Sequence, residues 1–136
     1  MKPVNLVLPL TFFAHTGVQA ARLLLALYLI HFGGQPLTVG LLAAALSILP
    51  ALLAVPIGQV VDRVGSRRPL LIALCLGTAG MLLPYFFPSV PVIFAAAVIV
   101  SLASVTLSVT TQNLVGLLST PEDRPRNFAN YSLANS

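Results

Sequence analysis

Long apolar stretches separated by short polar clusters form the main pattern of the chain. Between Arg22 and Asp62 there are 39 residues without a charged side chain, and between Arg68 and Glu122 there are 53. Each stretch is too long for one membrane crossing and suits two, because a spanning helix needs about 20 apolar residues. Helix breakers divide both stretches, at Gly33, Gly34 and Pro36 in the first and at Pro84, Pro88 and Pro91 in the second.

This pattern predicts an all-α fold, a polytopic helical bundle in a membrane. Residues 1–118 are expected to hold four transmembrane helices, over 6–30, 37–61, 69–86 and 91–118. Residues 119–136 change from apolar to polar and then to amphipathic, which predicts a loop and the start of an incomplete fifth helix. We therefore expect the sequence to be part of a longer protein, the alternative being a frayed tail on a finished four-helix protein.

The composition agrees with a lipid bilayer as the solvent and excludes several other classes of protein. Apolar residues make up 57% of the chain and charged residues 7%, against about 25% charged in soluble domains. The net charge of +4 does not indicate nucleic-acid binding, because the cations form short clusters without interleaved aromatic residues. A single cysteine, Cys75, excludes an internal disulfide, and no Cys, His or Asp cluster has the spacing of a metal site. We expect no metal and no cofactor.

Lysine and arginine are distributed unevenly over the predicted loops. Six of them lie on one side of the membrane and none on the other. Cytoplasmic loops carry the excess of these residues, so we predict a multi-pass protein of the cell membrane with a cytoplasmic N-terminus and a cytoplasmic loop after residue 118. The six cations are Lys2, Arg63, Arg67, Arg68, Arg124 and Arg126.

The loop between the second and third segments packs one acid, three cations and two glycines into a turn at the membrane surface. Gly58 is expected to let another helix approach closely, and Gly65 to supply the backbone conformation of a tight reversal. A generic positive-inside loop explains the arginines. It explains neither Asp62 nor the spacing of the glycines.

This loop resembles the signature of the major facilitator superfamily, Gly-x-x-x-Asp-Arg-x-Gly followed by basic residues. The resemblance extends over essentially the whole chain and implies the first part of a twelve-helix fold, with two six-helix halves around a central cavity. It also implies secondary transport by alternating access and a conformational gate at this loop, whose acid would meet a helix of the absent second half. The gate motif comprises Gly58, Asp62, Arg63, Gly65, Arg67 and Arg68.

Two features depart from the family pattern. Many members carry a basic residue directly after the second glycine, where it takes part in a charge relay with the acid, and this chain has Ser66 there. Arg67 is the residue that could replace it. Proton-coupled exporters often carry an arginine in the fourth helix, whereas the segment 91–118 has no charged residue. This absence does not favour proton antiport.

Polar residues follow one face of the first segment. Thr11, His15, Gln19 and Arg22 fall within an arc of about 80° at 100° per residue. Arg22 is a cation inside an apolar span, where exposure to lipid is costly. It is interpreted either as a cavity-facing residue or as a structural residue paired to a carbonyl or to another helix. His15 taken alone is equally typical of helix packing.

Small hydroxyl residues follow one face of the fourth segment. Ser101, Ser104 and Ser108 fall, with two further polar residues, within an arc of about 100°. Such residues allow helices to approach closely and can bond their own helix. Together with His15 and Gln19, they are therefore either packing residues or lining of a substrate pathway, and the family resemblance favours the pathway.

No catalytic triad, phosphate loop or carboxylate pair is visible, so the sequence does not predict an enzyme. We interpret the chain as part of a secondary transporter for a small solute. Arg22 would make its pathway favour solutes that are anionic or accept hydrogen bonds. The expected partners of the chain are the lipid bilayer, the solute and the missing C-terminal helices of the same protein. The alternative is a four-helix membrane subunit that transports nothing and packs against partner helices.

Overall fold

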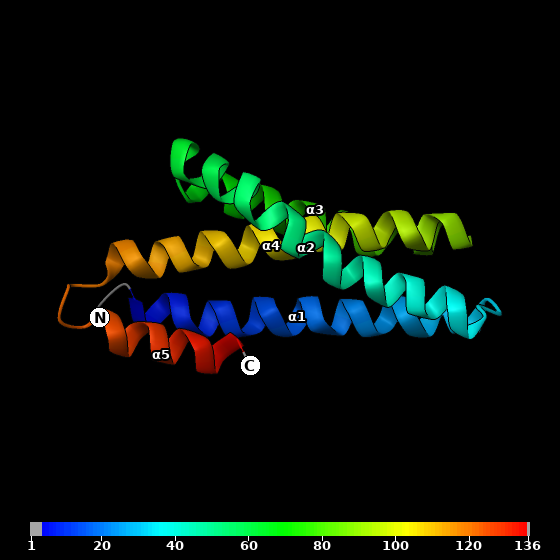
Figure 1. Ribbon diagram of the computed structural model, residues 1–136, viewed down its shortest axis with the longest axis horizontal. Coiled ribbons are helices and arrows are strands. Elements are labelled where there is room, and N and C mark those ends of the chain that lie inside the picture. Colours follow the sequence, from blue (N-terminus) through cyan, green and yellow to red (C-terminus); the bar gives the residue numbers. More distant parts are fainter. Residues whose placement is uncertain (1–3, 136) are drawn as a thin grey trace.

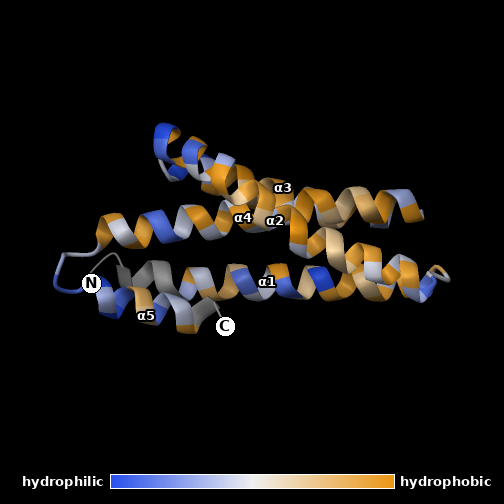
Figure 2. Ribbon diagram, viewed as in Figure 1, coloured by the Kyte–Doolittle hydropathy of each residue, from blue (hydrophilic) through white to orange (hydrophobic). Residues whose placement is uncertain are grey.

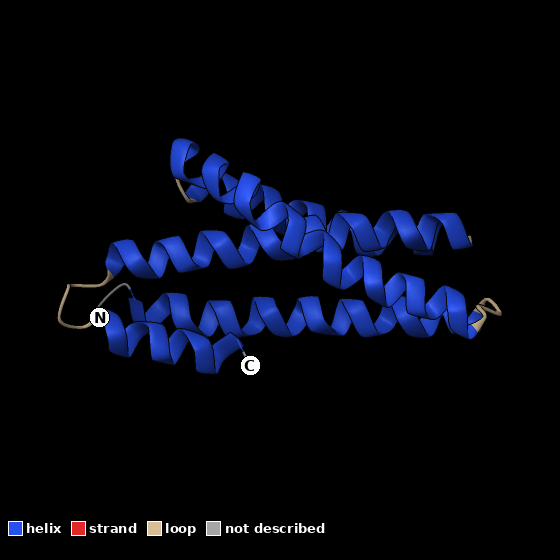
Figure 3. Cartoon of the chain, viewed as in Figure 1, coloured by secondary structure: helices blue, strands red, loops and turns tan. Residues whose placement is uncertain are grey.

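The computed structural model describes residues 4–135 as five helices with no strand among them (Figure 3). The predicted all-α class is therefore confirmed. One of the six cations on the predicted cytoplasmic side, Lys2, lies outside the described residues. The helices are α1 (Val4–His31), α2 (Pro36–Val64), α3 (Arg67–Phe86), α4 (Val90–Leu118) and α5 (Arg124–Asn135).

Glycine and proline form the turn between α1 and α2. Gly33 has a φ of 74°, a conformation that residues with a Cβ rarely adopt. A Cβ on Gly34 would lie 2.7 Å from the carbonyl oxygen of Leu29. Gln35 then has extended backbone, and Pro36 begins α2, where a missing N–H is harmless. The turn therefore depends on these four consecutive residues.

The central helix of the bundle is α4, which packs against α1, α2, α3 and α5 (Figure 1). Its contact with α3 depends on small residues. A Cβ on Gly80 would lie 2.9 Å from Cγ2 of Ile99, and a Cβ on Gly77 would lie 3.5 Å from Cβ of Ala103. Such residues bring helix backbones together in a membrane, where association depends on close packing.

The outer surface of the bundle is apolar. Leu27, Leu52 and Leu71 are 61%, 69% and 64% exposed. Figure 2 shows hydrophobic residues over most of the long helices and hydrophilic residues at the end that holds the α2–α3 and α4–α5 turns. Four helices, α1 to α4, are long and apolar enough to cross a membrane. The described residues thus form a multi-pass membrane protein with a lipid-facing exterior.

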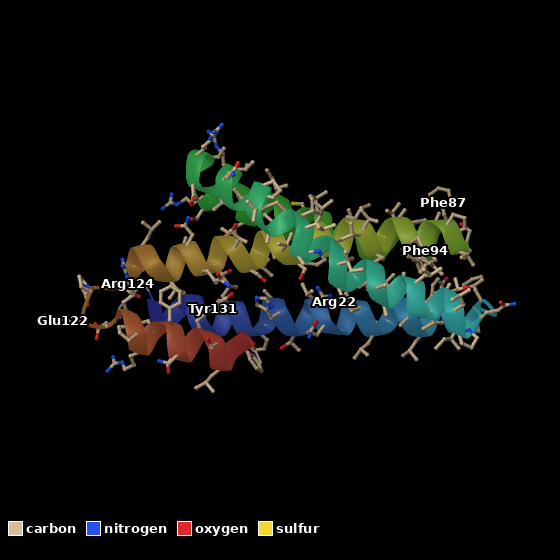
Figure 4. All side chains as sticks on the ribbon, in the orientation of Figure 1. Arg22, Phe87, Phe94, Glu122, Arg124 and Tyr131 are labelled. Carbon is tan, nitrogen blue, oxygen red and sulfur yellow. The ribbon has the colours of Figure 1, made fainter. Side chains whose placement is uncertain are left out.

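The short helix α5 runs beside α1 and below α4 (Figure 1). Tyr131 is buried and projects from α5 toward α4 (Figure 4), where its hydroxyl donates to the backbone oxygen of Ser108 at 3.4 Å. Near the start of α5, Nη2 of Arg124 donates to the backbone oxygen of Gly116 at 3.2 Å. A cation at this position suits the partial negative charge at the end of α4.

Candidate functional site

Arg22 lies near the middle of α1, where the polar face of this helix meets α4 (Figure 4). Its Nη2 donates to Oγ of Ser104 at 3.2 Å, and its Nη1 donates to Oε1 of Gln19 at 3.4 Å. Its Nε is buried and has no hydrogen-bond partner among the described residues. The guanidinium therefore links two helices and still has donor capacity that nothing in this part of the chain uses.

A cavity of about 190 Å³ opens beside Arg22, between α1 and α4. Its lining is polar apart from Val18. The imidazole of His15 contributes an Nε2 atom that is buried and has no hydrogen-bond partner within residues 4–135. Two residues beside the cavity, His15 and Arg22, therefore each carry a buried nitrogen without a hydrogen-bond partner among the described residues. It is lined by His15, Val18, Gln19, Arg22, Ser104 and Ser108.

The structure brings together five of the six residues predicted for the substrate pathway. Ser101 is the exception, because it is fully buried and does not line the cavity. Ser101 lies about one turn beyond Ser104 along α4, whereas the cavity extends from Ser104 in the other direction, toward Ser108. In this structure Ser101 is a packing residue.

The α2–α3 turn holds the gate motif at the end of the bundle. Gly65 has a φ of 82°, and its N–H donates to the carbonyl oxygen of Val61 at 2.9 Å, which ends α2. This position needs a glycine, in agreement with its predicted role. The three arginines of the motif, Arg63, Arg67 and Arg68, are exposed.

The acid of the motif has a partner within the chain. Oδ1 of Asp62 accepts a hydrogen bond from Nδ2 of Asn113 at 2.9 Å, which links α2 to α4. The family resemblance implied a partner in a second half of the protein. Within the described helices the partner is Asn113, because α4 packs against α2. The explanation for Gly58 needs correction. A Cβ there would lie 3.9 Å from Cγ1 of Val109, an ordinary van der Waals distance, so no close approach within the described part of the chain requires the glycine.

A family model of the Major Facilitator Superfamily matches residues 7–136, which include the cavity and the α2–α3 turn. The chain belongs to the major facilitator superfamily. The resemblance inferred from the loop motif is thereby confirmed, and the four apolar helices fit a polytopic bundle of this family. No curated protein and no solved structure matches the chain. Membership supports a secondary transporter in general, and suggests that the chain is not an enzyme.

In this superfamily member the cavity is rich in hydrogen-bond donors and lacks carboxylates. The three acids of the chain, Asp62, Glu122 and Asp123, lie at or near the turns. The guanidinium, imidazole, amide and hydroxyl groups of the lining can bind a solute that carries acceptors. They contain no activated nucleophile or paired carboxylate for covalent chemistry.

Asn113 is a residue that sequence reasoning missed. It is one of two consecutive amides, Gln112 and Asn113, in an apolar helix, and it lies 51 positions from Asp62. No motif or periodicity connects the two residues. The one signal was the presence of a strong donor in the membrane segment at the same depth as the α2–α3 turn.

Proposed function

We propose that this protein moves a small solute across the cell membrane by alternating access, along a pathway between α1 and α4. The observation that carries the proposal is the Arg22 guanidinium, which lies in mid-helix beside a polar cavity and bonds Ser104. Ionisable residues within membrane helices are costly and typically mark a pathway for substrates or ions. The exterior of the described bundle is apolar, whereas this cavity has a polar lining that can hold water or a solute.

The proposal includes further helices of the same protein. In the superfamily fold, solute sites lie near the bilayer midplane between two halves of the molecule. Helices of a second half would close the open side of the cavity, and the gate motif around Asp62 would control its opening. The Asp62–Asn113 hydrogen bond supports such a role, because it joins two spanning helices at one end of the bundle.

Cysteine accessibility tests the pathway without any knowledge of the solute. Single cysteines replacing Gln19, Ser104 and Ser108 in the full-length protein should react with small water-soluble thiol reagents, because thiolates form in water. Cysteines replacing Leu24 and Leu27 serve as controls, since both side chains are exposed on the apolar surface of α1. Alternating access predicts that a reagent on either side of the membrane reaches the pathway positions.

The pathway would be contradicted if the cysteines replacing Gln19, Ser104 and Ser108 were as unreactive toward the reagent as the control cysteines. That result would favour the alternative function, a subunit that transports nothing and in which Arg22 and Ser104 serve only to hold α1 against α4.

We also propose that the N-terminus and the α2–α3 turn lie in the cytoplasm, because the exposed arginines gather at that end. In a Cys75→Ala background, cysteines replacing Gln35 and Pro88 should react with an impermeant reagent applied to intact cells. Cysteines replacing Arg67 and Glu122 should react only after permeabilisation. All four positions are exposed, so a difference in labelling reports the side of the membrane. External labelling at position 67 would reverse the orientation.

A further inference from the structure

Away from their ends, the membrane helices contain one charged residue, Arg22. Arg22 is the only charged residue between Val4 and Val61, and residues 69–118 contain none. In the described part of the chain its hydrogen-bond partners are neutral, namely Gln19 and Ser104, and its buried Nε has no partner. Arg22 is partly buried within a membrane helix, where a cation is costly and is typically paired with an anion or lines a water-filled cavity. The site therefore lacks one negative charge and at least one acceptor.

His15 adds a second unsatisfied group to the same cavity. His15 lies seven positions before Arg22, which is about 10 Å along a helix at 1.5 Å per residue. Side chains on a helix lean toward its N-terminus, so the long Arg22 side chain extends toward His15. Both residues line the cavity, and both carry a buried nitrogen without a partner among residues 4–135. An acceptor held in this cavity would lie beside both residues.

The helices that face the cavity opposite α1 provide hydroxyl groups and no acid. Ser104 and Ser108 face the cavity from α4, and neither α4 nor the described part of α5 near it contributes an acid that could neutralise Arg22. Tyr131, the α5 residue that reaches α4 at this depth, bonds the Ser108 backbone. The missing charge must therefore come from outside the described helices.

We infer that the transported solute is a small organic monocarboxylate, bound with its carboxylate between Arg22 and His15 and its other polar groups toward Ser104 and Ser108. One guanidinium charge matches one carboxylate charge, and the planar fork of arginine suits the two carboxylate oxygens. This inference rests on the proposed function, since it names the solute class of that pathway.

Carboxylates and their amides form the matched probes for this inference. Acetate, lactate and benzoate would each be compared with acetamide, lactamide and benzamide, which have nearly the same shape and no charge. The readout is the thermal unfolding of the purified full-length protein as a function of probe concentration. At least one carboxylate should raise the unfolding temperature by a few degrees, because a ligand that binds the folded state stabilises it. Its amide should not.

Variants of the two residues then locate the site. Arg22→Gln should weaken the response to the carboxylate by about tenfold or more, and His15→Ala should weaken it to a smaller degree. His31→Gln and Arg126→Gln are the matched controls, because these residues are exposed and lie away from the cavity. Both controls should respond as the wild-type protein does.

Three results would overturn the inference. Amides could stabilise the protein as well as carboxylates, Arg22→Gln could leave the response intact, or no carboxylate of the series could have any effect. The last result would indicate that a carboxylate of another helix neutralises Arg22. The cysteine accessibility test uses no solute, so a reactive pathway combined with any of these results would refute the solute class and leave the transport proposal standing.

Discussion

Arg22→Gln is expected to lower solute transport by about tenfold or more, since it removes both a partly buried charge and the guanidinium that donates to Ser104. Hydrogen bonds to charged groups contribute about 1.5–3 kcal/mol, and about 1.4 kcal/mol corresponds to a factor of ten. The measurement is the initial rate of uptake into proteoliposomes that contain the full-length protein. The solute used is the one that most raises the unfolding temperature of the wild-type protein.

Arg22→Lys separates the charge from the shape of the guanidinium. Lysine keeps the charge but replaces a planar fork by a compact ammonium. Lysine therefore cannot bind two carboxylate oxygens with a planar fork, and the rate should fall, but less than in Arg22→Gln, which also loses the charge. Arg126→Gln is the control, because its side chain is 74% exposed and pairs only loosely with Asp123 at 3.8 Å. Normal transport by Arg22→Gln would show that the Arg22–Ser104 bond is a packing contact.

The helix ends were predictable where the chain carries strong local signals. Gly33 and Pro36 separate α1 from α2 as expected from the sequence. The second predicted segment stopped at residue 61, whereas α2 continues to Val64. The polar residues Asp62 and Arg63 do not end a helix at the membrane surface, and the backbone continues until Gly65 adopts its positive φ.

The site was predictable within each helix but not between helices. Angular spacing correctly grouped His15, Gln19 and Arg22 on one face, because a regular helix fixes these angles. The same spacing put Ser101 and Ser104 on one face of α4 and could not choose between them. The choice depends on how far α4 is shifted along α1, and that shift follows from the packing of the whole bundle. Arg22 bonds Ser104.

The Asp62–Asn113 pair was not predictable for the same reason. An acid in the last turn of α2 faces the partial negative charge of its own helix end, which is unfavourable by about 0.3–1 kcal/mol. This argument calls for a compensating partner without locating it, and the family resemblance pointed to a helix of the second half rather than to α4. The partner is on α4 because this helix packs against α2, which no local pattern reveals.

Asp62→Asn is expected to impair transport strongly while leaving the stability of the fold nearly unchanged. Asparagine has the same shape, its side-chain oxygen can still accept from Asn113, and it removes the unfavourable charge at the end of α2. The change in folding free energy should therefore stay within about 0.5 kcal/mol. If the carboxylate biases the gate between its two states, coupling of about 1–3 kcal/mol corresponds to about 5- to 150-fold in transport.

Variants of Asn113 distinguish the hydrogen bond from the charge. Asn113→Leu removes the donor and keeps the carboxylate, so it should slow transport if the 2.9 Å bond to Asp62 holds α2 against α4 in one state of the gate. Asn113→Asp places two carboxylates in direct contact, and their repulsion should give the larger loss. Glu122→Gln, at an exposed acid in the α4–α5 turn, is the control and should transport normally.

Uptake, expression and thermal unfolding would be measured for each variant. A parallel loss of expression and uptake in Asp62→Asn would assign Asp62 to folding, whereas lost uptake with intact unfolding behaviour assigns it to the gate.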